Sequence, residues 1–269
     1  MTSAIEADPG DMTATPLRHP TLIGPGFGSD AAGDPVTPTP AQSLALLARA
    51  MFRQGMCDGL AGHATFRQPN GVLLTTPHLI GWDEVTASDI CTLDPDGHQI
   101  AGRWSVPPAL QLHISLHRSR PDTVVAVHNH PKWSTTWSNL GRIPPTYDQT
   151  SASFTDEVRL IPYGGPVQET EFADDVVAEL AGASTALLAN HGVLILGSSP
   201  AEAFWRCYVL QWRCQMAWQV EAVGSGTLFP SDAAEFNKAI VDREFGGVFP
   251  GLFEYVARRE IAADSRVLS

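Results

Sequence analysis

Two histidines separated by one residue follow a β-branched segment and could bind one metal ion together. His128 and His130 come directly after residues 123–127, whose sequence TVVAV is typical of a buried strand. Side chains at positions i and i+2 of a strand lie on the same face, so both imidazoles can reach one ion. The alternative is two ordinary histidines at a strand–loop junction, because the pattern His-x-His is common.

A third histidine strengthens the metal hypothesis. His191 lies within Asn-His-Gly at residues 190–192, between two apolar segments that predict a strand interrupted by a turn. The glycine-marked turn directs the His191 side chain out of the sheet. A turn histidine satisfied by hydrogen bonds is the alternative. Together, three neutral imidazoles would suit Zn, Fe, Ni or Cu.

The elements that must position these histidines alternate between helices and strands. Helical spacing is found at residues 41–52, 110–120 and 200–223, and strand patterns at 63–67, 71–76 and 123–127. This interleaving predicts an α/β protein with a single domain over residues 41–269. Residues 1–40 are rich in Pro, Gly and Thr, and we expect an extended or partly disordered N-terminal arm there.

The composition argues against several classes of partner. The chain has 269 residues, 17 Lys+Arg and 29 Asp+Glu, with a net charge of -12. It therefore lacks the positive charge that supplies most non-specific affinity for nucleic acids or anionic membranes. No apolar segment reaches the ~18 residues of a spanning helix, and the first twenty residues do not resemble a secretory signal. We expect a cytoplasmic protein without nucleic-acid or membrane partners, and its four cysteines, with no C-x-x-C pair, to be mostly buried free thiols.

Several sequence blocks resemble the class II aldolase/adducin superfamily and occur in its order. They are GLAGHATFR at 59–67, LTTP at 74–77, His113 followed by RPDTVVAVHNH at 120–130, and LANHGV at 188–193. Together they cover roughly residues 41–225. The resemblance implies a three-layer αβα sandwich, a divalent metal on His128, His130 and His191, and a homotetramer with sites at subunit interfaces.

The chain departs from the sugar-phosphate aldolases of this superfamily at one informative place. Those enzymes carry Ser-Ser-Glu before the helix that here holds His113, and these positions correspond to Pro107, Pro108 and Ala109. An alanine can neither transfer a proton nor bind a metal, and a proline offers a phosphate neither an N–H nor a hydroxyl group. We therefore expect no sugar-phosphate binding or enolisation of the kind those aldolases perform.

Residues near the metal-binding segments favour an aromatic substrate. Trp133 and Trp137 follow His130 closely and would suit an aromatic or prenylated acid, although such rings most often lie in a core or an interface. Lys132 could meet a substrate carboxylate, with a solvated surface charge as the alternative. Thr76, in the LTTP block, is the remaining candidate for substrate binding.

Two further residues are candidates for acid–base roles. His63 replaces an Asn that is common in the aldolases, and we expect it to face the pocket; the alternative is a histidine that caps its own turn. Tyr147 follows His130 at roughly the distance of the catalytic tyrosine of the aldolases and could donate a hydrogen bond in the site. We expect the remaining histidines, which show no partner pattern, to lie on the surface: His19, His78, His98 and His117.

Within the superfamily, these departures are most similar to the non-heme iron oxygenases of aminocoumarin antibiotic biosynthesis. The resemblance includes Tyr-Asp-Gln at 147–149 and Trp-Arg-Cys at 205–207 and 212–214. It implies Fe(II), with Mn or Zn as alternatives, and O2 as co-substrate. The implied reaction is oxidative decarboxylation that cleaves a C–C bond of a 4-hydroxyphenyl substrate, with or without a prenyl group.

Two other functions stay open at this point. One is a divalent-metal-dependent lyase, either a decarboxylase of a hydroxylated aromatic acid or an aldolase, which would need a proton donor. The other is a non-catalytic, adducin-like interaction module. The three retained histidines argue against the module, because a scaffold has no need of a metal triad.

Overall fold

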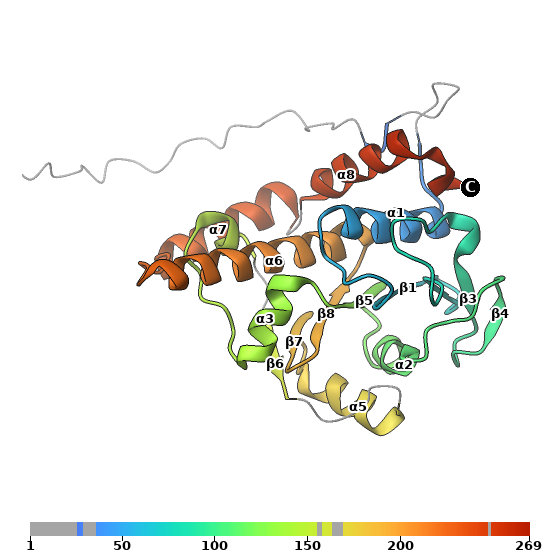
Figure 1. The fold of residues 1–269 in the computed structure, drawn as a ribbon, viewed down its shortest axis with the longest axis horizontal. Helices are drawn as coiled ribbons and strands as arrows, with labels where there is room; N and C mark the ends of the chain where they lie inside the picture. Colours follow the sequence, from blue (N-terminus) through green and yellow to red (C-terminus); the bar gives the residue numbers. More distant parts are fainter. Residues whose placement is uncertain (1–25, 29–35, 155–157, 163–168, 247–248) are drawn as a thin grey trace, which may run out of the picture.

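The computed structural model describes residues 26–28, 36–154, 158–162, 169–246 and 249–269 (Figure 1). Most of the predicted N-terminal arm, residues 1–40, lies outside the described residues. The first helix, α1 (Pro40–Arg53), begins one residue before its predicted start. Thr39 caps this helix through reciprocal contacts with Gln42, and Pro40 is tolerated in the first turn, where its missing N–H would be unpaired.

The described strands form one sheet with the order β4-β3-β2-β1-β5-β8-β7-β6. They are β1 (His63–Arg67), β2 (Leu73–Thr75), β3 (Cys91–Leu93), β4 (Gln99–Ala101), β5 (Val125–Asn129), β6 (Val158–Ile161), β7 (Thr185–Leu188) and β8 (Gly192–Gly197). All neighbouring pairs are antiparallel except β6 with β7. The predicted interrupted strand is therefore the β7–β8 hairpin, and its turn lies at one end of the sheet.

Helices cover both faces of this sheet, which confirms the predicted three-layer α/β architecture (Figure 1). One layer contains α1, α3 (Lys132–Leu140), α6 (Pro200–Val223) and α8 (Pro250–Ala263), and the other contains α2 (Leu110–Ser119) and α5 (Thr170–Glu179). The remaining helical segments are α4 (Gln149–Ala152), α7 (Ser231–Phe245), η1 (Ala87–Asp89) and η2 (Ser265–Leu268).

The central strands alternate between two cores with the two-residue period of a β-strand. On β5, Val125 and Val127 belong to the core under α1, α6 and α8, whereas Ala126 belongs to the core under α2 and α5. His128 continues the parity of Ala126, so its side chain lies on the α2 face. Asn129 has the opposite parity, and its amide donates to the Met56 carbonyl on the α6 side.

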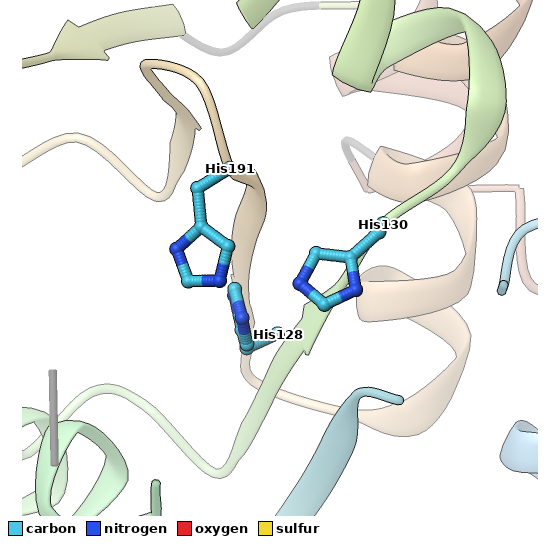
Figure 2. A group of neighbouring side chains, drawn as sticks. All are labelled: His128, His130 and His191. Atoms are coloured by element: carbon cyan, nitrogen blue, oxygen red, sulfur yellow. The ribbon is translucent and has the colours of Figure 1, made fainter. Parts of the chain in front are cut away.

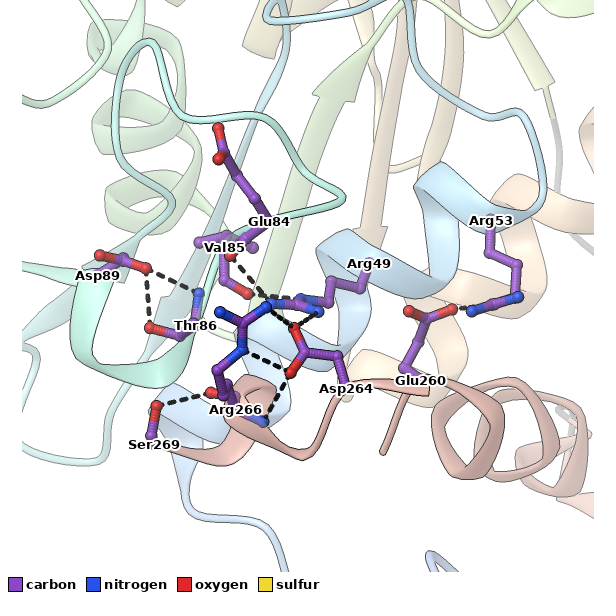
Figure 3. Close-up of polar contacts among 10 residues, drawn as sticks. All are labelled: Arg49, Arg53, Glu84, Val85, Thr86, Asp89, Glu260, Asp264, Arg266 and Ser269. Carbon is purple, nitrogen blue, oxygen red and sulfur yellow. Dashed lines mark hydrogen bonds and ion pairs between the residues drawn. The ribbon is translucent and has the colours of Figure 1, made fainter. Parts of the chain in front are cut away.

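Polar contacts fix the C-terminal segment to α1 and the loop before η1 (Figure 3). Arg49 is only 4% exposed, and its guanidinium donates to the carbonyls of Val85 and Glu84 at 2.7 and 2.9 Å and to the Asp264 carboxylate at 3.0 Å. The backbone N–H of Ser88 donates to the Ser269 carbonyl at 2.7 Å. The end of the chain is thus part of the α1 layer.

The cysteine prediction is confirmed by the structure. All four cysteines are free thiols, and three of them are buried: Cys91, Cys207 and Cys214. Burial raises the pKa of the Cys207 thiol to about 12, so this thiol stays protonated at neutral pH. Within the described residues, no helix has the length and apolar character needed to span a bilayer.

Candidate metal centre

The structure brings the three predicted metal ligands together (Figure 2). His128 is the penultimate residue of β5, His130 directly follows the strand, and His191 lies in the β7–β8 turn. One ligand atom from each imidazole lies within 4.8 Å of the others. The antiparallel register that pairs Asn129 with Val193 places this turn beside the end of β5. The turn requires a left-handed backbone at Asn190 (φ 56), a conformation that Asn tolerates better than most residues.

Hydrogen bonds orient two of these imidazoles so that Nε2 is free to bind a metal. His128 Nδ1 lies 2.9 Å from the Val193 carbonyl oxygen, which can only accept, so Nδ1 carries the proton. His130 Nδ1 lies 3.1 and 3.2 Å from the two carboxylate oxygens of Asp58. The buried Nε2 of His130 has no hydrogen-bond partner among the described residues. Such outer contacts are characteristic of metal-binding histidines.

The sequence analysis did not predict Asp58, whose carboxylate lies against His130. It precedes the GLAGHATFR block directly, but nothing in its spacing indicates contact with His130, 72 residues further along the chain. Its carboxylate also opposes the lowering of the pKa of His191. Asp58 therefore adds the negative charge that the three neutral ligands lack.

The electrostatic environment favours the neutral form of His128 and His191. Burial, followed by the nearby His63, holds the pKa of His128 well below its ordinary value of 6.5. Burial and then His130 lower the pKa of His191. Neutral imidazoles are the form that binds Fe(II), Mn(II) or Zn(II), so the donor set fits a divalent ion and leaves coordination positions for other ligands.

His63 lies next to this cluster, on the same face of the sheet. It pairs with His128 in the β1–β5 register, and the two ring centroids are 5.1 Å apart. Its Nδ1 lies 2.9 Å from Nε2 of His113 on α2. Its own Nε2 is buried without a hydrogen-bond partner in the described part of the chain. His63 therefore lies beside the histidine cluster, and its expected acid–base role stays a prediction.

The surface prediction was wrong for His117. This side chain is 6% exposed, and its Nε2 lies 2.8 Å from the Thr65 hydroxyl. His113 and His117 are four residues apart on α2 and share its sheet-facing side, a spacing that could have revealed the error. The surface prediction holds for His98, which contacts Asp94, whereas His78 is half-buried and His19 lies outside the described residues.

The structure places most of the predicted substrate-binding residues elsewhere. Trp137 is 0% exposed and donates from Nε1 to the Cys214 carbonyl at 2.8 Å, because α3 packs on α6. Trp133 packs beside Trp218, with ring centroids 5.1 Å apart, and the exposed Lys132 lies over Trp133. These three α3 residues therefore belong to the helical layer on the opposite face from His128.

Thr76 is a structural residue of the sheet in this fold. It is completely buried, and its hydroxyl accepts a hydrogen bond from the Ala64 N–H at 3.1 Å. Its own N–H donates to the Ala64 carbonyl at 3.0 Å. These contacts extend the β1–β2 pairing by one residue, and they leave Thr76 no free surface for a substrate.

Tyr147 also lies away from the histidines of its own subunit. Its ring lies beside Gly226, which follows the C-terminal end of α6. Val220, in the last turn of α6, lies against the same glycine. Asn129, the neighbour of His130, contacts α6 at Cys207. With a rise of about 1.5 Å per residue, Val220 lies about 20 Å further along the axis of α6 than Cys207. The catalytic role expected for Tyr147 therefore stays a prediction.

Residues 42–218 match the family model of the Class II Aldolase and Adducin N-terminal domain, and the chain belongs to this family. It is 25% identical over 195 residues to a 5-deoxy-D-ribulose 1-phosphate aldolase of Bacillus thuringiensis serovar kurstaki, covering 72% of this chain and 91% of that protein. It is 27% identical over 202 residues to a 4-hydroxy-3-prenylphenylpyruvate oxygenase/4-hydroxy-3-prenylbenzoate synthase of Streptomyces roseochromogenus subsp. oscitans, covering 73% and 72%.

The fold is shared with solved members of the family. An L-fuculose 1-phosphate aldolase from Glaciozyma antarctica PI12 superposes with a TM-score of 0.73 at 21% identity, covering 84% of this chain and 90% of that one. These relatives are enzymes, which supports an enzymatic activity here. Class II aldolases use a divalent metal, and the histidine cluster of this chain could bind one.

Proposed function

We propose that this protein is a non-heme Fe(II) oxygenase that cleaves a C–C bond of a 4-hydroxyphenyl acid, with or without a prenyl group, by oxidative decarboxylation with O2. The observation that carries the proposal is the composition of the site. Its three ligands are His128, His130 and His191, and Ala109 occupies the position of the glutamate that serves the sugar-phosphate aldolases. Similarity to the prenylphenylpyruvate oxygenase supports the same substrate class.

The residues of the chain would divide the work in the following way. An Fe(II) ion would supply the chelation of a 2-oxo or 2-hydroxy acid and the redox chemistry with O2. His128, His130 and His191 would hold it through neutral imidazoles, and Asp58 would fix the orientation of His130. His63, buried beside them, would exchange a proton with a hydroxyl group of the substrate.

A divalent-metal-dependent lyase is the second candidate, because an aldolase is among the similar relatives. That reaction needs a group that protonates a carbanion. Tyr147, whose ring borders Gly226 beyond the end of α6, could serve as this group if subunit assembly brings it to the site of a neighbouring subunit. This arrangement would require the proposed homotetramer with sites at subunit interfaces.

Oxygen uptake by protein purified without oxygen and loaded with Fe(II) tests the proposal. We expect stoichiometric O2 consumption and CO2 release with a member of a panel of 4-hydroxyphenylpyruvates and 4-hydroxymandelates, with and without a 3-prenyl group. Anaerobic release of CO2 or an aldehyde, without oxygen uptake, would instead establish the lyase.

A matched pair of variants tests the assigned ligands. His191→Ala should lose both bound metal and turnover, whereas His98→Ala, at an exposed histidine, should keep both. Full metal content in His191→Ala would refute the assignment of this ligand.

A further inference from the structure

We propose that Gly192 positions the metal ligand His130, because any side chain at residue 192 would occupy the space of the His130 ring. Gly192 directly follows another assigned ligand, His191, and is the first residue of β8. It has no side chain to offer an ion, so it is a positioning residue that acts through His130. This role rests on the proposed function only through the three assigned ligands, and not on the reaction.

The backbone conformation of residue 192 does not require a glycine. The left-handed residue of the β7–β8 turn is Asn190, with φ 56. Gly192 has no positive φ, and it pairs with Leu188 as an ordinary strand residue. Alanine or a β-branched residue could adopt this backbone. The reason for a glycine here is therefore space and not conformational freedom.

The end of β5 beside Gly192 leaves no room for a Cβ atom. An ideal Cβ at residue 192 would lie 2.5 Å from the carbonyl oxygen of Asn129 and closer still to Cδ2 of His130. Both separations are below 3.0 Å, a range that real Cβ atoms essentially never show. Even the single methyl group of alanine would force either the backbone of β5 or the imidazole to move.

The backbone of β5 is held at Asn129. The strand lies between β1 and β8, and Asn129 pairs with Val193 of β8. The buried amide of Asn129 also donates to the Met56 carbonyl. A shift of this backbone would disturb the pairing of β5 with both neighbouring strands, whereas an imidazole can turn about its side-chain bonds. The ring of His130 is therefore the part that would yield.

The close approach falls on the edge of the ring that carries the ligand atom. In an imidazole, Cδ2 is bonded directly to Nε2, so pressure on Cδ2 moves Nε2 as well. Nε2 is the free nitrogen of His130, because Nδ1 on the other edge lies 3.1 Å from the Asp58 carboxylate. The ring centroid of His191 is only 5.0 Å from that of His130. Asp58 thus holds one edge of the ring, and Gly192 makes room for the other.

Displacement of His130 would break up the donor set. One ligand atom from each of the three assigned histidines lies within 4.8 Å of the others. A methyl group at residue 192 would turn Nε2 of His130 out of this group and draw Nδ1 away from Asp58. The site would then keep two ligands in position and lose the third, so we expect a folded protein with weak metal binding.

Zinc affinity, measured by competition with a chelator in the absence of substrate and oxygen, tests this role. Gly192→Ala should bind Zn(II) about 100-fold more weakly than the wild type, at the upper end of the 10–100-fold cost of losing contacts that orient a ligand. Gly251→Ala is the matched control, because an added Cβ on this α8 residue meets no atom within 4 Å and its φ is not positive. Equal affinities of the two variants would overturn the proposal.

Urea unfolding of the metal-free protein separates contact with the ring from a general need for glycine. Gly192→Ala should destabilise the wild type more than it destabilises His130→Ala, because the second protein has no ring at this place. An equal loss in both backgrounds would show that the Asn129 backbone alone excludes a side chain, and would overturn the positioning role. If Gly192→Ala alone does not fold, recovery of folding when it is combined with His130→Ala supports the role, and failure of both proteins to fold refutes it.

These outcomes are independent of oxygen uptake. Loss of zinc affinity in Gly192→Ala would support the positioning role even if the wild type consumed no O2. Oxygen uptake by the wild type would likewise stand even if Gly192→Ala bound zinc normally.

Discussion

At the scale of single residues, the site depends on which nitrogen of each histidine is free. A backbone carbonyl fixes His128, and the Asp58 carboxylate faces Nδ1 of His130. Without these contacts, either ring nitrogen of each of the three imidazoles could be the one that binds the metal ion. The outer contacts convert two of them into oriented donors, and Asp58 adds a charge close to both His130 and His191.

Asp58→Asn should therefore weaken metal binding without unfolding the protein. An amide can still meet His130, but it lacks the charge that holds the ring, and loss of such partners typically costs 10–100-fold in affinity. Competition with a chelator at fixed pH measures this change. Asp175→Asn, at an exposed position on α5, is the matched control and should bind as the wild type does. Equal affinities of the two variants would show that Asp58 does not support the metal.

At the scale of elements, helix α2 delivers two buried histidines to the sheet and should make stability depend on pH. Burial lowers the pKa of His117 to about 4 in the folded state, against 6.5 as its ordinary value. Between these values the unfolded chain binds more protons, so stability falls as pH decreases from 6.5 toward 4. For His117 alone, the full loss is about 3 kcal/mol, and His113 acts in the same direction.

Urea unfolding of the metal-free protein between pH 7 and pH 4.5 measures this loss. We expect His117→Gln to reduce the slope of the unfolding free energy against pH. His98→Gln, at an exposed histidine, should leave the slope unchanged. A flat profile for the wild type would show that these histidines are not buried in the neutral form.

The strands that hold the metal ligands could be predicted from the sequence because the patterns that indicate them involve only neighbouring residues. The parity of His128 and His130 on one strand, and the glycine-marked turn at His191, each depend on neighbouring residues. Contacts such as Asp58 with His130 depend on the path of the chain between distant segments. No local pattern encodes that path.

Helix α3 shows the limit of reasoning from proximity in sequence. Trp133 and Trp137 follow His130 within two turns, yet α3 packs on α6 and directs Trp137 into the core of that layer. Successive residues at the end of β5 point to opposite faces of the sheet, so residues that are adjacent in sequence there contact different helical layers. The partner of His117, Thr65, also lies on another element, although the helical spacing of His117 from His113 already indicated a shared face.

At the scale of the whole molecule, the C-terminal segment closes the α1 layer. Arg49 connects α1, the loop before η1 and the segment after α8 through three acceptors, and Asp264 also accepts from Arg266 (Figure 3). A second pair, Arg53 with Glu260, joins α1 to α8. The Arg49–Asp264 and Arg53–Glu260 pairs each join groups more than 200 residues apart in the chain, so they report on global folding and not on local helix formation.

Arg49→Leu should therefore destabilise the protein as a whole. The substitution leaves the carbonyls of Val85 and Glu84 without their donor and removes a charge partner from Asp264, and we expect a loss of about 2–3 kcal/mol in the free energy of unfolding. Arg118→Leu is the matched control, because its ion pair with Asp96 is exposed on both sides and should contribute less than about 1 kcal/mol. Denaturant unfolding followed by tryptophan fluorescence measures both. If the two variants lost equally little, water would satisfy these groups as well as Arg49 does, and docking of the C-terminal segment would depend on apolar contacts such as those of Phe253 and Val256 alone.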